Sequence, residues 1–175
     1  PTSGVILGAS TKKLASCLKD AFARREIKKT YHAIVIASGK RVKNETWKDN
    51  LVEKREKGKL RVTRGKGPIA ITKVHMEREK TGRYGLNLLA LTPQTGRTHQ
   101  LRVQCALRRM PVLGDKNYGD FSLNRKILRA SKTDRLFLHA SKISLSVKFQ
   151  GQELEFSAES PLPRSFGKLF SSKQP

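Results

Sequence analysis

The stretch 94-QTGRTHQ-100 gathers an arginine, a histidine, two threonines and two glutamines into seven consecutive residues. It follows the apolar run 86-LNLLALT-92 and precedes a helical pattern that begins at Leu101. Loops between a strand and a helix often carry function, because the rigid elements on either side fix the direction of their side chains. An arginine in such a loop can pair with an anion, either a carboxylate of the protein or a phosphate of a ligand.

The same stretch also has a purely structural interpretation. Thr98 would cap the following helix, since a threonine oxygen accepts a hydrogen bond from a free N–H group of the first turn. Arg97 would then be an exposed residue at the start of that helix. The spacing of these residues leaves both interpretations open.

The rest of the chain lacks the common motifs of catalysis and cofactor binding. A glycine-rich phosphate loop, a dinucleotide fingerprint, a nucleophile elbow and HExxH are all absent. The four histidines show no metal-ligand spacing, and Cys17 and Cys105 are too few for a disulfide framework or a metal site. We therefore predict no cofactor and no metal, and we expect both cysteines to be small buried residues.

The charge of the chain predicts its partner. Its 37 Lys and Arg residues against 14 Asp and Glu residues give a formal net charge of +23. A polyanion is the natural partner of such a surface, because each phosphate neutralised by Lys or Arg releases condensed counterions. No apolar run is long enough to span a membrane, and no basic helix carries a bulky apolar face. We therefore expect structured RNA as the partner, and not a membrane.

The elements that must position these residues follow from hydrophobic patterning, which predicts an α+β fold with a largely antiparallel sheet. Strands are expected at 5–7, 30–37, 69–78, 84–91, 136–149 and 154–157. Helices are expected after a cap at Ser10 or Thr11, from Leu101 to Met110, and over 124–130. The residues of the first helix that share its core-facing side are Leu14, Leu18, Ala21 and Phe22.

The segment 38–68 is polar and rich in glycine, with short strands expected near 46–51 and 60–63. We interpret it as a basic hairpin and not as a separate domain. Residues 1–170 are then expected to form one domain, followed by a loose tail at 171–175.

Several segments occur in a recognisable order. The stretch 95-TGRTHQLRV-103 is followed by 111-PVLGDKNYG-119, and the chain starts with 1-PTSGVIL-7. Between them lies 28-KKTYHAIV-35, and 136-LFLHA-140 comes later. These segments resemble the motifs of the RluA family of RNA pseudouridine synthases, including the end of HRLDxxTSG and the pattern K-x-Y-x-A-x-V. The resemblance spans nearly the whole chain and is weakest over 40–66.

The resemblance implies a fold and an activity. Enzymes of that family isomerise uridine to pseudouridine in rRNA or tRNA without cofactor or metal, after the target nucleotide has flipped out of its stack. Their catalytic domain is an α+β fold with a largely antiparallel mixed sheet flanked by a few helices and loops. We expect a monomer that acts in the bacterial cytoplasm or, if the source is eukaryotic, in the mitochondrion.

The resemblance also assigns roles to residues. Arg97 matches the arginine that pairs with the catalytic aspartate, and Tyr31 matches the tyrosine that packs on the uracil and is implicated in removing the C5 proton. Leu101 matches an aliphatic residue that lines the base pocket. Further substrate contacts are expected from Thr98, His99 and Gln100, and RNA phosphate contacts from Lys28, Lys29 and Arg102.

The catalytic aspartate of HRLDxxTSG would stand two positions before Pro1, outside this sequence. Asp115 matches the PIxGDxxYG motif and not the nucleophile. The chain as written is therefore expected to be inactive by itself, whereas the chain with its upstream aspartate would be an RNA pseudouridine synthase. The alternative is a non-catalytic RNA-binding or ribosome-assembly module with the same fold.

Overall fold

The computed structural model describes residues 2–37, 43–56, 58–80, 85–130 and 132–171. Its strands are β1 (Ser3–Gly4), β2 (Lys28–Ile36), β3 (Glu45–Glu56), β4 (Lys59–Lys80), β5 (Leu86–Pro93), β6 (Leu138–Phe149) and β7 (Gln152–Glu159). Its helices are α1 (Lys12–Arg24), α2 (Gln100–Leu107), α3 (Phe121–Ala130) and α4 (Arg164–Ser171).

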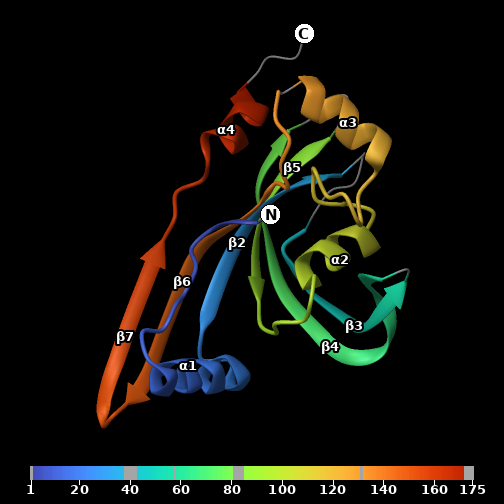
Figure 1. Ribbon diagram of the computed structural model, residues 1–175. Helices are drawn as coiled ribbons and strands as arrows, with labels where there is room; N and C mark the ends of the chain where they lie inside the picture. Colours follow the sequence, from blue (N-terminus) through green and yellow to red (C-terminus); the bar gives the residue numbers. More distant parts are fainter. Residues whose placement is uncertain (1, 38–42, 57, 81–84, 131, 172–175) are drawn as a thin grey trace.

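Within these residues the strands form one sheet in the order β1-β6-β2-β5-β4-β3, with β7 also paired to β6. Every pairing is antiparallel except that of β1 with β6. Helix α1 lies at one end of the molecule beside β6 and β7, whereas α3 and α4 lie at the opposite end (Figure 1). The prediction of an α+β fold with a largely antiparallel sheet is confirmed.

The central strand β2 has a core on each face, because successive side chains of a strand point to opposite sides. Ala33 and Val35 belong to one cluster, which also holds Leu101 and Cys105 of α2. Ile34 and Ile36 belong to another, covered by apolar residues of α3 and α4 that include Ile127, Phe166 and Leu169. Sequence patterning missed α4. The sheet therefore has α2 on one face and α3 with α4 on the other.

Strands β3 and β4 form one long hairpin where the sequence predicted only short strands. The register between them shifts after Asn50, and the pairing resumes at Leu51 with Arg64. A Cβ atom on Gly67 would overlap the carbonyl oxygen of Leu51, so the close approach at this bulge requires glycine. This glycine lets β4 run without interruption from the hairpin into the central sheet.

Two local predictions were wrong. The run 5–7 is not a strand, because only Ser3 and Gly4 pair with β6. Phe22 is 41% exposed and not in the core, because it lies at the last turn of α1, where its ring contacts the ammonium of Lys29 instead (5.0 Å from Nζ to the ring centroid). The expected strand start at Tyr84 and most of the expected tail lie outside the described residues.

The two cysteines differ in burial: Cys105 is fully buried and Cys17 is half-buried. Burial raises the pKa of the Cys105 thiol to about 12, so this thiol stays protonated at neutral pH. In the part of the chain that is described, no helix is long and apolar enough to cross a membrane. The same residues contain no group of three or more His, Cys, Asp or Glu side chains that could hold a metal ion.

A buried carboxylate on β3 joins this strand to α2. Asp49 accepts hydrogen bonds from Arg64 Nη2 (2.6 Å), Gln104 Nε2 (2.9 Å) and Arg108 Nη1 (2.9 Å). Burial by itself would raise the pKa of the Asp49 carboxyl, but these three hydrogen bonds outweigh it and hold the pKa below its usual range. Asp49 is therefore charged in the folded protein at neutral pH. It links β3 to Arg64 of β4 and to Gln104 and Arg108 at the C-terminal end of α2.

We expect Asp49→Ala to lower the free energy of unfolding by about 2–3 kcal/mol, because it removes the buried acceptor that Arg64, Gln104 and Arg108 share. Urea unfolding at neutral pH measures this loss, and Asp20→Ala on the exposed side of α1 should change stability by less than about 0.5 kcal/mol. The carboxyl has a lower pKa in the folded than in the unfolded state, so its contribution is present above about pH 4 and is lost as the pH falls through the folded pKa. A stability difference that stays constant on acidification would contradict this assignment.

Candidate functional site

A cavity of about 570 Å³ opens where the end of β5 and the start of α2 meet the first residues of the chain. Residues from distant segments line it, among them Thr2, Tyr31, Arg97, Leu101 and Arg135. The sheet order explains this convergence, because β2 pairs with both β5 and β6. Side chains from the centre of the sheet and from the loops at its edge therefore face the same space.

Tyr31 reaches the cavity from the central strand. It pairs with Leu91 of β5 on one side and with Ala140 of β6 on the other, next to a register shift between Thr30 and Tyr31. Burial raises the pKa of the Tyr31 phenol, so the ring is neutral at physiological pH. Leu101, at the start of α2, is 7% exposed and lines the same cavity. Together they provide an apolar surface inside a polar rim.

Gln100 anchors the loop that precedes α2. Its Oε1 accepts hydrogen bonds from Thr95 Oγ1 (2.7 Å) and from the backbone N–H of Arg97 (3.0 Å). Its Nε2 donates to the carbonyl of Ile71 (3.0 Å) and to Thr72 Oγ1 (2.9 Å). These four bonds use the full capacity of an amide side chain. Gln100 therefore holds the loop against β4. It also lines the cavity, and its expected contact with substrate stays a prediction.

Thr98 neither caps α2 nor lies among the residues that line the cavity. Residue His99 is the N-cap of α2, with a left-handed backbone (φ 51°) and no side-chain capping bond. The backbone N–H of Arg97, just before Thr98, donates to the side-chain oxygen of Gln100. Thr98 is also absent from the cavity lining. The structure thus removes both the capping role and the direct substrate contact expected for Thr98.

Arg97 is exposed at the mouth of the cavity. Its Nε donates one long hydrogen bond, 3.4 Å, to the carbonyl of Ile69. Among the described residues, no carboxylate forms an ion pair with Arg97. An arginine remains protonated at any physiological pH, so its guanidinium is a charged donor available to an anion that enters the cavity.

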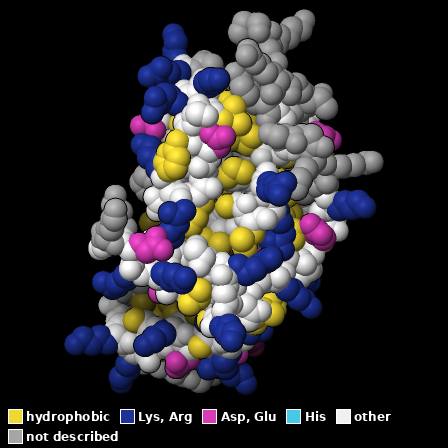
Figure 2. Space-filling view, turned by 90° about the vertical axis from the view of Figure 1, so that its right-hand side faces the viewer, with side chains coloured by type: hydrophobic (Ala, Val, Ile, Leu, Met, Phe, Trp, Pro, Cys, Tyr) yellow, Lys and Arg dark blue, Asp and Glu magenta, His cyan; other side chains and the backbone are white. Residues whose placement is uncertain are grey.

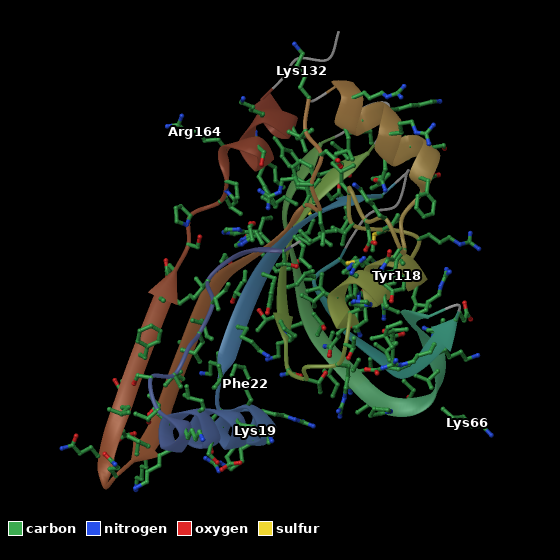
Figure 3. The ribbon with its side chains drawn as sticks, viewed as in Figure 1. Lys19, Phe22, Lys66, Tyr118, Lys132 and Arg164 are labelled. Atoms are coloured by element: carbon green, nitrogen blue, oxygen red, sulfur yellow. The ribbon has the colours of Figure 1, made fainter. Side chains whose placement is uncertain are left out.

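His99 lines the cavity and is held by Tyr118. The Tyr118 hydroxyl accepts a hydrogen bond from the backbone N–H of Val62 (3.0 Å) and lies 2.8 Å from His99 Nδ1. Burial lowers the pKa of His99, and the nearby charge of Arg102 lowers it further. This environment fits a neutral imidazole that accepts at Nδ1 and carries its proton at Nε2. Figure 3 shows Tyr118 beside α2.

Arg102, expected to contact RNA phosphate, is already paired within the protein. Its Nε and Nη2 donate to the two carboxylate oxygens of Asp115 at 2.8 and 2.6 Å. Asp115 is fully buried and also accepts from the N–H groups of Asn117 and Tyr118. Burial would raise the pKa of Asp115, but these hydrogen bonds outweigh it and lower the pKa. The fork of Arg102 therefore fixes the 114–118 loop. Arg102 also lines the cavity, and its expected phosphate contact stays a prediction.

Of the two predicted lysines, only Lys29 reaches the cavity. Lys28 is exposed and is not part of the lining, whereas Lys29 is half-buried and lines it. Burial lowers the pKa of Lys29, and the described residues offer its ammonium the Phe22 ring but no carboxylate. Lys29 is thus a second cation, next to Arg97, that faces the cavity without an acidic partner.

Sequence reasoning missed a network that holds the first residues of the chain. Ser3 Oγ accepts a hydrogen bond from Arg135 Nη2 and lies 2.8 Å from His139 Nδ1. His139 is buried, and its Nε2 lies 3.1 Å from the carbonyl of Ser160. His139 lies on β6, and nothing in the sequence links it to Ser3. This network fixes the segment that places Thr2 at the cavity.

We expect Arg102→Ala to lower the free energy of unfolding by about 3 kcal/mol, since it leaves the buried charge of Asp115 without its partner. Arg61→Ala, at an exposed arginine of β4, is the matched control and should change stability by less than about 0.5 kcal/mol. Thermal or urea unfolding measures both. If Arg102→Ala kept wild-type stability and lost only RNA affinity, Arg102 would be a phosphate contact after all.

Comparison with known proteins identifies the family of this chain. A family model described as RNA pseudouridylate synthase matches residues 1–107. Two relatives named tRNA pseudouridine synthase C, from Salmonella typhi and Vibrio vulnificus, are 36% and 34% identical to this chain over 170 residues. These alignments cover 90% and 91% of this chain, and 64% and 68% of the two relatives.

A relative from Rickettsia conorii, named ribosomal large subunit pseudouridine synthase C, is 36% identical over 163 residues. This alignment covers 91% of the chain but 50% of the relative, so the chain spans about half to two thirds of these proteins. The solved structure of human RNA pseudouridylate synthase domain containing 1 has the same fold, with a TM-score of 0.67 at 22% identity over 95% of this chain and 75% of that one. The chain belongs to the RNA pseudouridylate synthase family.

Proposed function

We propose that the protein to which this chain belongs isomerises uridine to pseudouridine in RNA. The observation that carries the proposal is the convergence of Arg97, Tyr31 and Leu101, from three separate segments, on one cavity. The names of the relatives state tRNA and the ribosomal large subunit, so the substrate class is tRNA or rRNA. The volume of about 570 Å³ lies in the range of small-ligand sites and admits one nucleotide flipped out of its stack.

We assign each part of that nucleotide to a part of the cavity. The uracil ring packs on Tyr31, whose raised pKa keeps the phenol neutral, and against Leu101. The ribose lies toward Arg97, where the catalytic carboxylate is held. Lys29 is positioned for the phosphate, because its ammonium faces the cavity without an acidic partner. His99 offers a further polar contact at the cavity wall.

The reaction exchanges one bond of the uracil for another. The carboxylate attacks or deprotonates the ribose, and the bond from C1′ to N1 breaks. The uracil turns and a bond from C1′ to C5 forms, while the carboxylate leaves the ribose or returns the proton that it took. C5 then loses its proton and N1 gains one. Arg97 keeps the carboxylate ionised and fixes its orientation, since a guanidinium stabilises the charged form of a neighbouring acid. Tyr31 is assigned a part in removing the C5 proton.

The carboxylate of this mechanism is placed two positions before Pro1. Thr2 lines the cavity, and an extended chain covers at most about 3.5 Å per residue. A residue three positions before Thr2 is therefore within about 10 Å of the cavity wall. The network of Ser3, Arg135 and His139 supports this placement, because it fixes the direction in which the chain enters.

The surface of the chain suits an RNA substrate. On the side that carries α2 and α3, Lys and Arg side chains outnumber Asp and Glu and surround exposed hydrophobic groups (Figure 2). We propose that residues 1–170 act as a single catalytic domain and as a monomer. We propose a cytoplasmic location, which the bacterial relatives named for tRNA and for the ribosomal large subunit support.

The position of the nucleophile can be tested with an N-terminally extended chain. We expect the 175-residue chain to release no tritium from tRNA or rRNA labelled at C5 of uridine. The chain preceded by its native residues should release it, and an Asp→Asn change two positions before Pro1 should abolish the release. Release by the 175-residue chain itself would show that another group is the nucleophile. No release from the extended protein would favour a non-catalytic RNA-binding module.

The role of Arg97 can be tested in the extended protein. Arg97→Lys keeps the charge but loses the two-pronged geometry that orients a carboxylate. We expect single-turnover rates to fall on the order of 100-fold, with a much smaller change in the RNA dissociation constant. Arg164→Lys is the matched control, since Arg164 is exposed at the start of α4, away from α2 (Figure 3). Wild-type turnover in Arg97→Lys would make Arg97 only a helix-start residue.

A further inference from the structure

A second cavity, of about 610 Å³, lies along α3 next to the first. The two cavities share Gly114, Lys116 and Asp134 in their linings. A ligand that occupies the first cavity can therefore continue into the second without crossing the body of the protein. We call this second cavity the α3 groove.

The sequence of α3 leaves one side of the helix for this groove. Phe121, Arg125 and Leu128 are spaced by four and three residues, so they share a side of the helix. The opposite side carries Ile127 and Leu123, which pack in the cluster that contains Phe137 and Phe166, and half-buried Leu128 packs at the edge of that cluster as well. Phe121 is 61% exposed, although α3 has a core against which an aromatic ring could pack. Its ring is thus presented to the groove and not to the interior.

The rim of the α3 groove is strongly basic. It carries Lys116, Arg125, Arg129 and Lys132 against one carboxylate, Asp134. That carboxylate pairs with Lys116 at 3.2 Å, in an exposed contact that contributes little. Among the described residues, no ion pair involves Arg125 or Arg129. The charge of this rim therefore matches an anionic occupant and not a neutral apolar ligand.

The wall shared with the first cavity is rigid. Asn124 Oδ1 accepts a hydrogen bond from the Gly114 N–H at 2.9 Å, and Asn124 Nδ2 donates to the carbonyl of Asp115 at 3.1 Å. Asp120 accepts from the Leu123 N–H at 2.9 Å and so caps the start of α3. The groove and the first cavity consequently keep one relative orientation, which a ligand spanning both of them requires.

An exposed aromatic ring among unpaired cations is the combination that binds single-stranded nucleic acid, because bases stack on the ring and phosphates bind the cations. We propose that the α3 groove binds an unpaired nucleotide next to the uridine that occupies the first cavity. Its base stacks on Phe121, and the adjoining phosphates bind Arg125, Arg129 and Lys132. This inference rests on the proposed function for the identity of the strand.

The test uses short single-stranded RNAs with one central uridine and 2-aminopurine at one neighbouring position at a time, bound to the extended protein. The fluorescence of 2-aminopurine falls when its base stacks. We expect quenching at a position beside the uridine, and its loss in Phe121→Ala together with an affinity about tenfold weaker. Phe121→Trp should restore both, since a larger ring also stacks.

Phe156→Ala is the matched control, because Phe156 is 47% exposed on β7, a strand that does not line the α3 groove. It should bind RNA as the wild type does. Unchanged affinity and quenching in Phe121→Ala would overturn the inference and leave the groove to another occupant, such as a protein partner. The Arg97→Lys turnover assay is independent of this result. If Arg97→Lys still lowers the single-turnover rate as expected, only the assignment of the α3 groove fails, and the proposed function stands.

Discussion

The candidate site depends on the hydrogen bonds of one buried amide, that of Gln100. Through Thr72, this amide continues into a buried chain of polar groups: Thr72 Oγ1 donates to Gln104 Oε1 at 2.6 Å, and Gln104 Nε2 donates to Asp49. Buried polar groups are costly unless every one has a partner, and a fully satisfied chain specifies one arrangement. The loop that carries Arg97 therefore has a fixed conformation, although Arg97 itself is exposed.

The acidic residues of this basic chain also have a defined place in the fold. Asp49 and Asp115 are buried, and each binds arginines of the surrounding elements. These pairs compensate positive charge inside the protein and connect α2 to β3 and to the 114–118 loop. Most of the remaining Lys and Arg residues stay at the surface, where they bind a polyanion best.

The proposed path of the RNA follows the cations that have no acidic partner within the described residues. The first cavity contains residues that match the family motifs, with Arg97 and Lys29 as its cations without acidic partners. The α3 groove adds Phe121 and further cations along the same wall. Base stacking is tolerant of sequence, so such a groove would hold the strand near the target while the first cavity selects uridine. Affinity and selectivity would thus come from adjacent but separate groups of residues.

The sequence by itself determined the family, the class of fold and most of the elements, because strand and helix periodicities and the order of the motifs are local properties. Motif matches also predicted roles for Arg97, Tyr31 and Leu101, and the structure brings these three residues to one cavity. Only the tertiary structure decided which polar residues are available to a ligand. Gln100 and Arg102 lie in the same motif as Arg97, yet the partners that occupy them, Ile71 with Thr72 and Asp115, are distant in sequence. Hydrogen-bond saturation depends on such long-range contacts, and no local pattern encodes them.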